Sequence, residues 1–181
     1  QSGSDLLLEK MRRRYKSDLY KNRIEKIKKL IPNCCIGVDV IVGFPGETEE
    51  EFLKTYNFLN ELDISYLHVF PYSERDNTTA VRIQEDIVPM HVRSERSKML
   101  HILSNKKKNY FYQENKSTFH QVLWESDNNE GFLHGFTENY IKVKTPYNTS
   151  LCNTIQEVYL EDFDREQVYS IRINEPVSVW I

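Results

Sequence analysis

The stretch IGVDVIVGFPGET, residues 36–48, decides the fold class of this chain. Its first seven residues are mostly β-branched and carry a single charge, which is typical of a buried strand. Gly43 and Gly46 follow in a loop. Thr48 and Glu51 then form the S/T-x-x-E pattern of a capping box, which predicts the start of a helix. The order strand, glycine loop, helix predicts a βα unit, and such units place ligands at the carboxyl end of the strand.

The glycine loop itself has two interpretations of equal weight. Gly43 and Gly46 lack a Cβ atom and allow the backbone to approach a ligand closely. They suit an ordinary tight turn between a strand and a helix equally well. The loop contains no Gly-Lys-Ser/Thr sequence, so it is not a nucleoside-triphosphate P-loop.

The flanking segments continue an α/β pattern with a parallel sheet. A helix capped by Ser17 is predicted to precede the strand, and YLHVF at residues 66–70 is a second strand after the βα unit. Pro89 suits the first turn of a long helix that reaches about Tyr112. The first helix has an apolar face with spacings of four and three residues, formed by Tyr20, Ile24, Ile27 and Ile31.

The sequence pattern changes near residue 114. Five short strand-like runs separated by Asp-, Asn- and Gly-rich turns predict a small all-β barrel. The runs cover residues 118–125, 131–136, 139–145, 155–162 and 167–173. Charge changes at the same place, because residues 1–113 hold 19 Lys and Arg against 16 Asp and Glu, whereas residues 114–181 hold 5 against 11. We therefore expect two domains, residues 1–113 and residues 114–181.

Composition excludes several classes of protein. The 181 residues contain no apolar run long enough to cross a membrane and no signal peptide. A net charge of −3 excludes a globally basic nucleic-acid binder. Three cysteines in no framework spacing argue against a disulfide scaffold and favour a reducing cytoplasm. The start at Gln1 instead of Met indicates a fragment.

Polar residues near the two strand ends are the first candidate site residues. Asp39 lies inside an apolar strand, so its carboxylate is expected to be paired, hydrogen-bonded or at a ligand pocket. Tyr72 and Arg75 follow the second strand in a loop, as residues of active-site loops do, although a solvated loop is the commoner case. The five histidines show no metal-ligand spacing. Arginines 12–14 form a basic cluster that is either a solvated face or a phosphate contact.

The predicted barrel has its own candidate surface. Tyr140, Lys142 and Lys144 alternate in sequence, which would place an aromatic ring beside two cations on one face of a strand. Aromatic and cationic side chains together are how small barrels hold RNA. The acidic balance of residues 114–181 argues against strong binding by the barrel alone.

Several stretches together resemble the radical S-adenosylmethionine methylthiotransferases. The matching stretches are QSGSD at residues 1–5, MRRRY at 11–15 and DVIVGFPGET at 39–48. LHVFPYSER at residues 67–75 and GFTENY at 135–140 are similar to the branch of that family that acts on threonylcarbamoyladenosine in tRNA. The isopentenyladenosine branch, the ribosomal-protein branch and a non-catalytic RNA-binding module remain as alternatives.

The resemblance implies a fold, a reaction and cofactors. Residues 1–113 would be the later part of an open TIM-like radical SAM barrel, and residues 114–181 a TRAM domain that binds tRNA. The family uses S-adenosylmethionine and two [4Fe–4S] clusters to attach a 2-methylthio group to the adenosine next to the anticodon. The partners implied are tRNA and S-adenosylmethionine, with no membrane and no obligate protein partner.

The resemblance also implies roles for individual residues. The arginine of the family's Met-x-Arg-x-Tyr pattern corresponds to Arg13, whose guanidinium suits the carboxylate of the cofactor. The implied cofactor-binding residues are Gln1, Ser2, Arg13, Asp39, Ile41, Gly43, Glu47 and Tyr72. The implied RNA-binding residues are Arg75, Tyr140, Lys142 and Lys144.

The chain departs from the family pattern in two places. The Cys-x-x-x-Cys-x-x-Cys ligand motif is absent from the sequence, so this chain is expected to bind no cluster and to be inactive by itself. The family's Arg-x-Gly-Thr turn is replaced by RDNT at residues 75–78, where Asn tolerates a positive φ better than most residues do.

Overall fold

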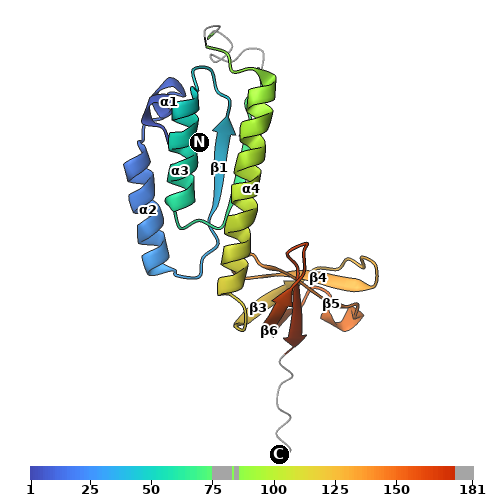
Figure 1. Ribbon diagram of the computed structural model, residues 1–181. Coiled ribbons are helices and arrows are strands. Elements are labelled where there is room, and N and C mark those ends of the chain that lie inside the picture. The colour runs from blue at the N-terminus through green and yellow to red at the C-terminus, as the bar shows by residue number, and fades with distance from the viewer. Residues whose placement is uncertain (75–82, 84–85, 174–181) are drawn as a thin grey trace, which may run out of the picture. The chain divides into compact units, whose positions relative to one another are not determined.

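The computed structural model describes residues 1–74, 83 and 86–173, and the chain divides into two compact units between Lys108 and Asn109. The assignment of residues 1–113 and 114–181 to named domains stays a prediction. In Figure 1 the first unit shows helices beside strand β1. The helices are α1 (Asp5–Lys10), α2 (Ser17–Leu30), α3 (Glu49–Glu61) and α4 (Met90–Glu114). The strands are β1 (Gly37–Val42), β2 (Tyr66–Pro71), β3 (Phe119–Trp124), β4 (Phe132–Thr137), β5 (Lys142–Pro146), β6 (Ile155–Phe163) and β7 (Tyr169–Ile173), with a short 3-10 turn η2 (Thr149–Leu151).

Strands β1 and β2 are parallel neighbours, which confirms the α/β prediction. Their register runs from Gly37 opposite Tyr66 to Val42 opposite Pro71. One face of the pair packs into an apolar core with the helices, and this core includes Val38, Val40, Val42, Phe52, Leu59, Leu67, Leu100 and Leu103. A TIM-like barrel is not seen in the part of the chain that the structure describes, so that finer expectation stays a prediction.

The other face of β1 corrects the expectation that Asp39 is a buried charge, while its place at a ligand pocket stays a prediction. Burial alternates along the strand, and Asp39 lies on the exposed face, opposite His68 of β2. The sequence suggested a strand buried on both sides, but only one side is covered in this structure. The carboxylate is therefore solvated and is not a buried charge that requires a partner.

The start of helix α3 agrees with the sequence prediction, whereas the start of helix α2 differs from it. Thr48 caps α3, accepting a hydrogen bond from the backbone N–H of Glu51 at 3.3 Å. The second half of the capping box does not form, because the Glu51 carboxylate instead accepts hydrogen bonds from Ser4 and Lys54. Helix α2 begins one residue earlier than expected, with Lys16 as its N-cap and Ser17 inside the helix.

The second unit is a closed five-stranded barrel with strand order β3-β4-β5-β7-β6, which confirms the small all-β barrel. All pairs are antiparallel except β5 with β7. Its interior is filled by side chains with no exposed surface, namely Val122, Trp124, Leu133, Ile141, Val143, Val158, Leu160 and Tyr169. The end of α4 belongs to this unit, because Tyr112 accepts a hydrogen bond from the Tyr169 hydroxyl at 2.5 Å.

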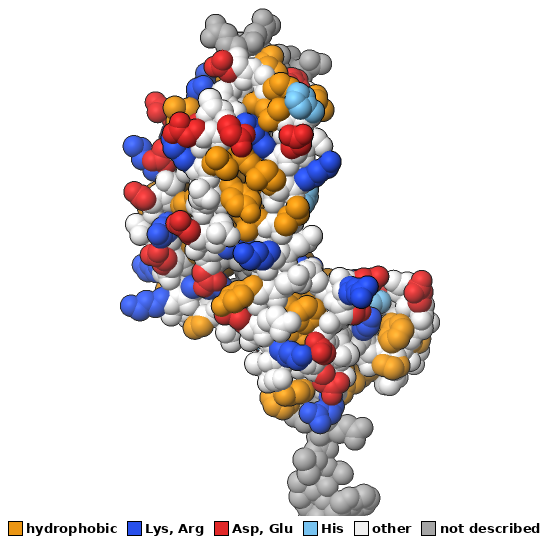
Figure 2. Space-filling view, in the orientation of Figure 1, with side chains coloured by type: hydrophobic (Ala, Val, Ile, Leu, Met, Phe, Trp, Pro, Cys, Tyr) orange, Lys and Arg blue, Asp and Glu red, His pale blue; other side chains and the backbone are white. Residues whose placement is uncertain are grey.

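The described residues include no helix that is both long enough and apolar enough to span a membrane. On the face of the molecule shown in Figure 2, Lys, Arg, Asp and Glu side chains surround small groups of hydrophobic ones over the helices.

Candidate functional site

The first corner of the site is the loop after β1. Gly43 and Gly46 have φ of 78° and 83°, a region that favours glycine. The backbone N–H of Gly43 donates to Oε2 of Glu47 at 2.7 Å, so the loop is tied by its own carboxylate. A Cβ atom at Gly43 would lie 2.4 Å from Cγ of Arg93. Glycine is therefore required here both by backbone conformation and by close packing.

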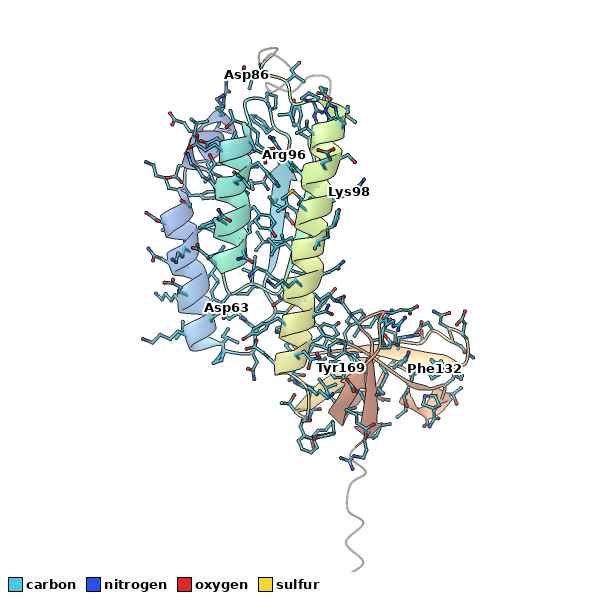
Figure 3. All side chains as sticks on the ribbon, viewed as in Figure 1. Asp63, Asp86, Arg96, Lys98, Phe132 and Tyr169 are labelled. Carbon is cyan, nitrogen blue, oxygen red and sulfur yellow. The ribbon has the colours of Figure 1, made fainter. Side chains whose placement is uncertain are left out.

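Two buried partners hold Glu47 in place. Arg96, which is 6% exposed, donates to the Glu47 carboxylate at 2.9 Å and to the Glu47 carbonyl at 2.8 Å. The other terminal nitrogen of Arg96 donates a hydrogen bond to the Glu49 carboxylate at 3.0 Å, and the Arg96 guanidinium lies over the ring of Phe52. Figure 3 shows Arg96 on α4, facing α3. Burial raises the pKa of Glu47, although the Gly43 N–H and Arg96 act in the opposite direction.

The second corner follows β2. The backbone N–H of Tyr72 donates to the carbonyl of Val42 at 2.8 Å, which joins the two strand ends. Arg93, which is 3% exposed, donates to the Tyr72 carbonyl at 2.8 Å and to the Val88 carbonyl at 2.7 Å. It also forms a two-pronged ion pair with Glu74, whose pKa is lowered by this hydrogen bonding. Arg93 therefore fixes the loop after β2 to the start of α4.

The third corner is formed by the first residues of the chain. The carbonyl of Gln1 accepts a hydrogen bond from the backbone N–H of Ile41 at 2.9 Å, which places Gln1 beside β1. The side chain of Gln1 accepts from Arg13 at 3.0 Å. The Ser2 hydroxyl turns the other way and bonds Thr55 of α3 at 2.9 Å. The corner thus brings Gln1, Arg13 and Ile41 together, while Ser2 anchors it.

A cavity of about 260 Å³ opens next to this third corner. Apolar walls and cationic groups both contribute to its lining, which comprises Lys10, Met11, Arg12, Arg13, Ile41, Phe44 and Ile83. Phe44 packs edge-on against Tyr72, with ring centroids 5.4 Å apart. A ligand with a flat, weakly polar part and an anionic group matches this lining.

The structure separates the predicted cofactor residues into two groups. Gln1, Arg13 and Ile41 surround or adjoin the cavity. Gly43, Glu47, Tyr72 and Ser2 form the internal hydrogen bonds that shape the corners, and Asp39 lies on the open face of β1. Arg75 and the turn at residues 75–78 lie outside the described residues. Arg93 and Arg96 were not predicted, because an arginine in a helix carries no sequence signal for burial.

The barrel surface differs from the sequence expectation. Tyr140 lies in the turn before β5, with φ of 69°, so it does not alternate with Lys142 and Lys144 along a strand. Lys144 is paired with Asp164 at 2.5 Å. Tyr140, which is 65% exposed, stacks on Phe136 with ring centroids 5.1 Å apart, and Phe136 is the cross-strand neighbour of Lys142.

Exposed apolar side chains extend this cluster across the barrel. Leu123 is paired with both Phe136 and Ile155 in neighbouring strands. Leu123 and Ile155 are 54% and 64% exposed. We call the set Ile155, Leu123, Phe136, Tyr140 and Lys142 the barrel row. Its combination of stacking surface and a cation is of the kind that binds unpaired bases.

In the part of the chain that the structure describes, no three His, Cys, Asp or Glu side chains are grouped so that they could hold a metal ion. Cys34 and Cys35 are half-buried, and burial raises the pKa of the Cys35 thiol, which disfavours the thiolate that metals require. The donor set in the described residues does not fit an iron–sulfur cluster.

Comparison with known proteins shows which proteins the chain is similar to. Residues 1–59 match the Radical SAM superfamily. The threonylcarbamoyladenosine tRNA methylthiotransferase MtaB of Bacillus subtilis is 42% identical over 147 residues, which are 79% of this chain and 32% of that protein. MtaB of Aquifex aeolicus is 41% identical over 80% of this chain and 34% of its own length. The tRNA-2-methylthio-N(6)-dimethylallyladenosine synthase of Bacillus mycoides is 33% identical over 99% of this chain and 35% of its own length.

The chain thus spans about a third of the length of the curated relatives that it matches. The similarity runs through both structural units, since the match to the Bacillus mycoides protein covers nearly all of the chain. Along nearly all of its length the chain is thus similar to part of the radical SAM tRNA methylthiotransferases.

Proposed function

We propose that this chain is part of a tRNA methylthiotransferase that adds a 2-methylthio group to N6-threonylcarbamoyladenosine next to the anticodon. Two relatives with that substrate in their names are 42% and 41% identical to the chain. In this proposal the α/β unit contributes to the S-adenosylmethionine pocket and the barrel binds tRNA.

The observation that carries the proposal is that Arg13 and Ile41 line one cavity and that Gln1 is hydrogen-bonded to both. The guanidinium of Arg13 is held by Gln1 and offers further N–H donors to a carboxylate. Ile41 and Phe44 provide apolar walls for the adenine end of the cofactor. S-Adenosylmethionine, when bound, supplies the methyl group and the radical chemistry of such reactions. The chain's own residues bind and orient it.

The buried arginines give this pocket its shape. Arg93 and Arg96 tie the loops after β1 and β2 to the start of α4, so the backbone corners are preorganised. Because the described residues do not fit an iron–sulfur cluster, we assign this chain no cluster ligation. The two [4Fe–4S] clusters belong to the longer enzyme in this proposal, and the chain by itself is inactive.

The barrel row supplies the RNA-binding part of the proposal. Tyr140 and Phe136 offer stacked rings, and Lys142 offers a cation beside them. Lys144 is partly neutralised by Asp164, so it contributes less to phosphate binding than Lys142 does. Arg75 is included as an RNA contact on the family resemblance alone.

A second candidate substrate is the isopentenyl-type adenosine. Two dimethylallyladenosine synthases match the chain along 99% of its length at 33% and 35% identity, and that of Bacillus pumilus matches 76% of it at 39% identity. The 42% and 41% identity of two MtaB proteins favours threonylcarbamoyladenosine.

Nucleoside analysis tests the proposal directly. Disruption of the encoding gene should remove 2-methylthio-N6-threonylcarbamoyladenosine from total tRNA, as measured by liquid chromatography and mass spectrometry, and leave N6-threonylcarbamoyladenosine in place. Loss of the 2-methylthio isopentenyl nucleoside instead would select the second candidate. Unchanged levels of both 2-methylthio nucleosides would contradict the proposed tRNA activity.

A further inference from the structure

The turn between β4 and β5 carries Tyr140 in a conformation that its surroundings must hold. The N–H of Thr137 donates to the carbonyl of Ile141 at 3.0 Å, and the N–H of Tyr140 donates to the carbonyl of Thr137 at 2.9 Å. These bonds close a hairpin loop of three residues, the last of which is left-handed in the common form of such loops. Tyr140 has φ of 69° there. A bulky residue keeps this conformation only where neighbouring groups fix the turn.

A chain of buried polar side chains fixes this turn from one side. The Thr137 hydroxyl donates to Oδ1 of Asn139 at 2.6 Å, and Nδ2 of Asn139 donates to Oδ1 of Asn115 at 2.9 Å. Nδ2 of Asn115 then donates to the carbonyl of Phe111 at 2.7 Å, in the last turn of α4. Thr137, Asn139 and Asn115 are 4%, 8% and 5% exposed. All members of the chain belong to the second unit.

The backbone that follows Tyr140 is fixed as well. The N–H of Ile141 donates to the Thr137 hydroxyl at 2.8 Å, and the Ile141 side chain has no exposed surface. The N–H of Lys142 donates to the Tyr112 hydroxyl at 3.1 Å. Both sequence neighbours of Tyr140 are therefore anchored inside the barrel, whereas the Tyr140 ring is exposed and stacks on Phe136.

This arrangement separates the residues that hold the turn from the ring that the turn presents. Buried hydrogen-bonded networks restrict a segment to one arrangement, because each unpaired member would be costly. A stacking surface that is fixed before binding loses less conformational freedom when a base binds to it. The amides of Asn115 and Asn139 can therefore influence binding at Tyr140 without touching a ligand.

We propose that Asn115 and Asn139 are positioning residues for RNA binding, because their amide–amide hydrogen bond holds the turn that presents the Tyr140 ring to an unpaired base. The inference rests on the proposed function, in which the barrel row binds RNA. It adds two buried residues outside the row that set the affinity of the row through Tyr140.

The first test follows the Tyr140 ring without RNA, in the full 181-residue chain. Asn115→Ala and Asn139→Ala each remove the amide–amide hydrogen bond. Asn148→Ala is the matched control, because Asn148 lies outside the row and its Oδ1 likewise holds a turn of the barrel, accepting from the N–H of Ser150 at 3.0 Å. Proton nuclear magnetic resonance reports the ring signals of Tyr140, which are identified by their absence from Tyr140→Asn.

In both amide variants the Tyr140 signals should move toward their positions in an unstructured peptide, since stacking on Phe136 is loosened. Asn148→Ala should leave them in place. Asn115→Asp keeps the oxygen that accepts from Asn139 and should restore most of the shift. Fluorescence of Trp124, which is buried in the barrel, shows whether each variant is folded. If Asn115→Ala does not fold, Asn139→Ala and Asn115→Asp decide the outcome.

The second test measures affinity for an anticodon-type RNA hairpin by fluorescence anisotropy. Asn115→Ala and Asn139→Ala should each weaken binding roughly threefold to fivefold, and by no more than Tyr140→Asn does. Added to Tyr140→Asn, either change should cause no further loss, because the ring through which it acts is already absent. The dependence of affinity on salt should not change, since no cation is removed.

Two results would overturn the positioning role. One is that the Tyr140 signals stay in place in the folded amide variants. The other is that these variants weaken RNA binding equally with and without the Tyr140 ring. Either result leaves the proposed function standing as long as Tyr140→Asn itself weakens binding. An unsubstituted chain that does not bind the hairpin would overturn both the role of the barrel in the proposed function and this inference.

Discussion

Two sets of basic side chains lie near the same strand ends but differ in burial and in pairing. Arg93 and Arg96 are almost fully buried and are paired with Glu74 and Glu47. Lys10, Arg12 and Arg13 are exposed at a cavity, and among the described residues their side chains form one hydrogen bond, from Arg13 to Gln1. The difference teaches that positive charge near a ligand site does not identify a ligand-binding residue. A buried arginine that is paired with a carboxylate shapes the site, whereas a solvated one beside a cavity is available to bind.

Replacing Arg96 should give the largest effect. Arg96→Met leaves the Glu47 carboxylate buried without its cation, and breaking such a pair destabilises a protein by roughly 3–5 kcal/mol. The α/β unit should unfold at lower denaturant concentration, as followed by far-ultraviolet circular dichroism. Both tryptophans of the sequence follow the α/β unit in the chain, so tryptophan fluorescence serves as an internal control and should not shift.

Lys98→Met is the matched control, because Lys98 is an exposed residue of the same helix. It should change stability by less than about 0.5 kcal/mol. Similar losses of stability for Arg96→Met and Lys98→Met would show that the buried ion pair of Arg96 and Glu47 does not hold the loop after β1. The contrast between the two sets of basic residues would then fail.

A methyl group at Gly43 should have the next largest effect. Gly43→Ala combines a positive φ with a contact of 2.4 Å to Arg93, and together these should cost roughly 3 kcal/mol. Gly131→Ala isolates the first of these causes, because Gly131 has φ of 84° and no atom within 4 Å of an added Cβ. It should cost about 1 kcal/mol. The stability of Gly43→Ala is followed by circular dichroism and that of Gly131→Ala by tryptophan fluorescence. Equal losses of stability in the two variants would mean that the Arg93 side chain moves aside freely.

A substitution in the barrel row tests whether its exposed side chains bind RNA. Tyr140→Asn retains a residue that tolerates positive φ but removes the ring that stacks on Phe136. Affinity for an RNA hairpin should fall roughly fivefold to tenfold, which corresponds to about 1 kcal/mol of base stacking. Tyr147→Asn removes a tyrosine outside the row and should leave affinity unchanged in the same anisotropy titration. An equal loss with both variants would remove the row from the RNA surface.

The pH dependence of stability should show the smallest effect. Since the pKa of Glu47 is raised in the folded state, its contribution to stability is present below the unfolded value of 4.5 and is lost as pH rises through the folded pKa. The free energy of unfolding of the α/β unit should therefore decline more steeply with rising pH above 4.5 than it does in Glu47→Gln. Parallel pH profiles for the two proteins would indicate that Arg96 fully compensates for the burial of Glu47.

Much of the fold could be predicted from the sequence. The β-branched run before Gly43 identified β1, and the regular spacing of apolar runs and turns after residue 118 identified five strands that all appear in the barrel. Thr48 was correctly predicted as the cap of α3. These features are local, because the period of side chains along a strand or helix is fixed by its own backbone.

Less of the candidate site than of the fold could be predicted from the sequence. The cofactor roles of Gln1, Arg13, Ile41, Glu47 and Tyr72 were implied by the family resemblance and stay predictions. The structure adds that the Glu47 carboxylate and the Tyr72 backbone form internal hydrogen bonds. Which of several polar groups is satisfied internally depends on neighbours distant in the chain. Arg96 and Glu47 are 49 residues apart, and no short-range pattern joins them.

The sequence by itself determined the βα unit and the strands of the barrel, since hydrophobic period, glycine and capping residues act over a few positions. Tertiary structure alone decided that Asp39 is solvated, that Arg93 and Arg96 are buried, and that Arg12 reaches a cavity through a left-handed turn. The physical reason is that burial and pairing are set by which surfaces meet in space, and each of these side chains takes its environment from elements far away along the chain.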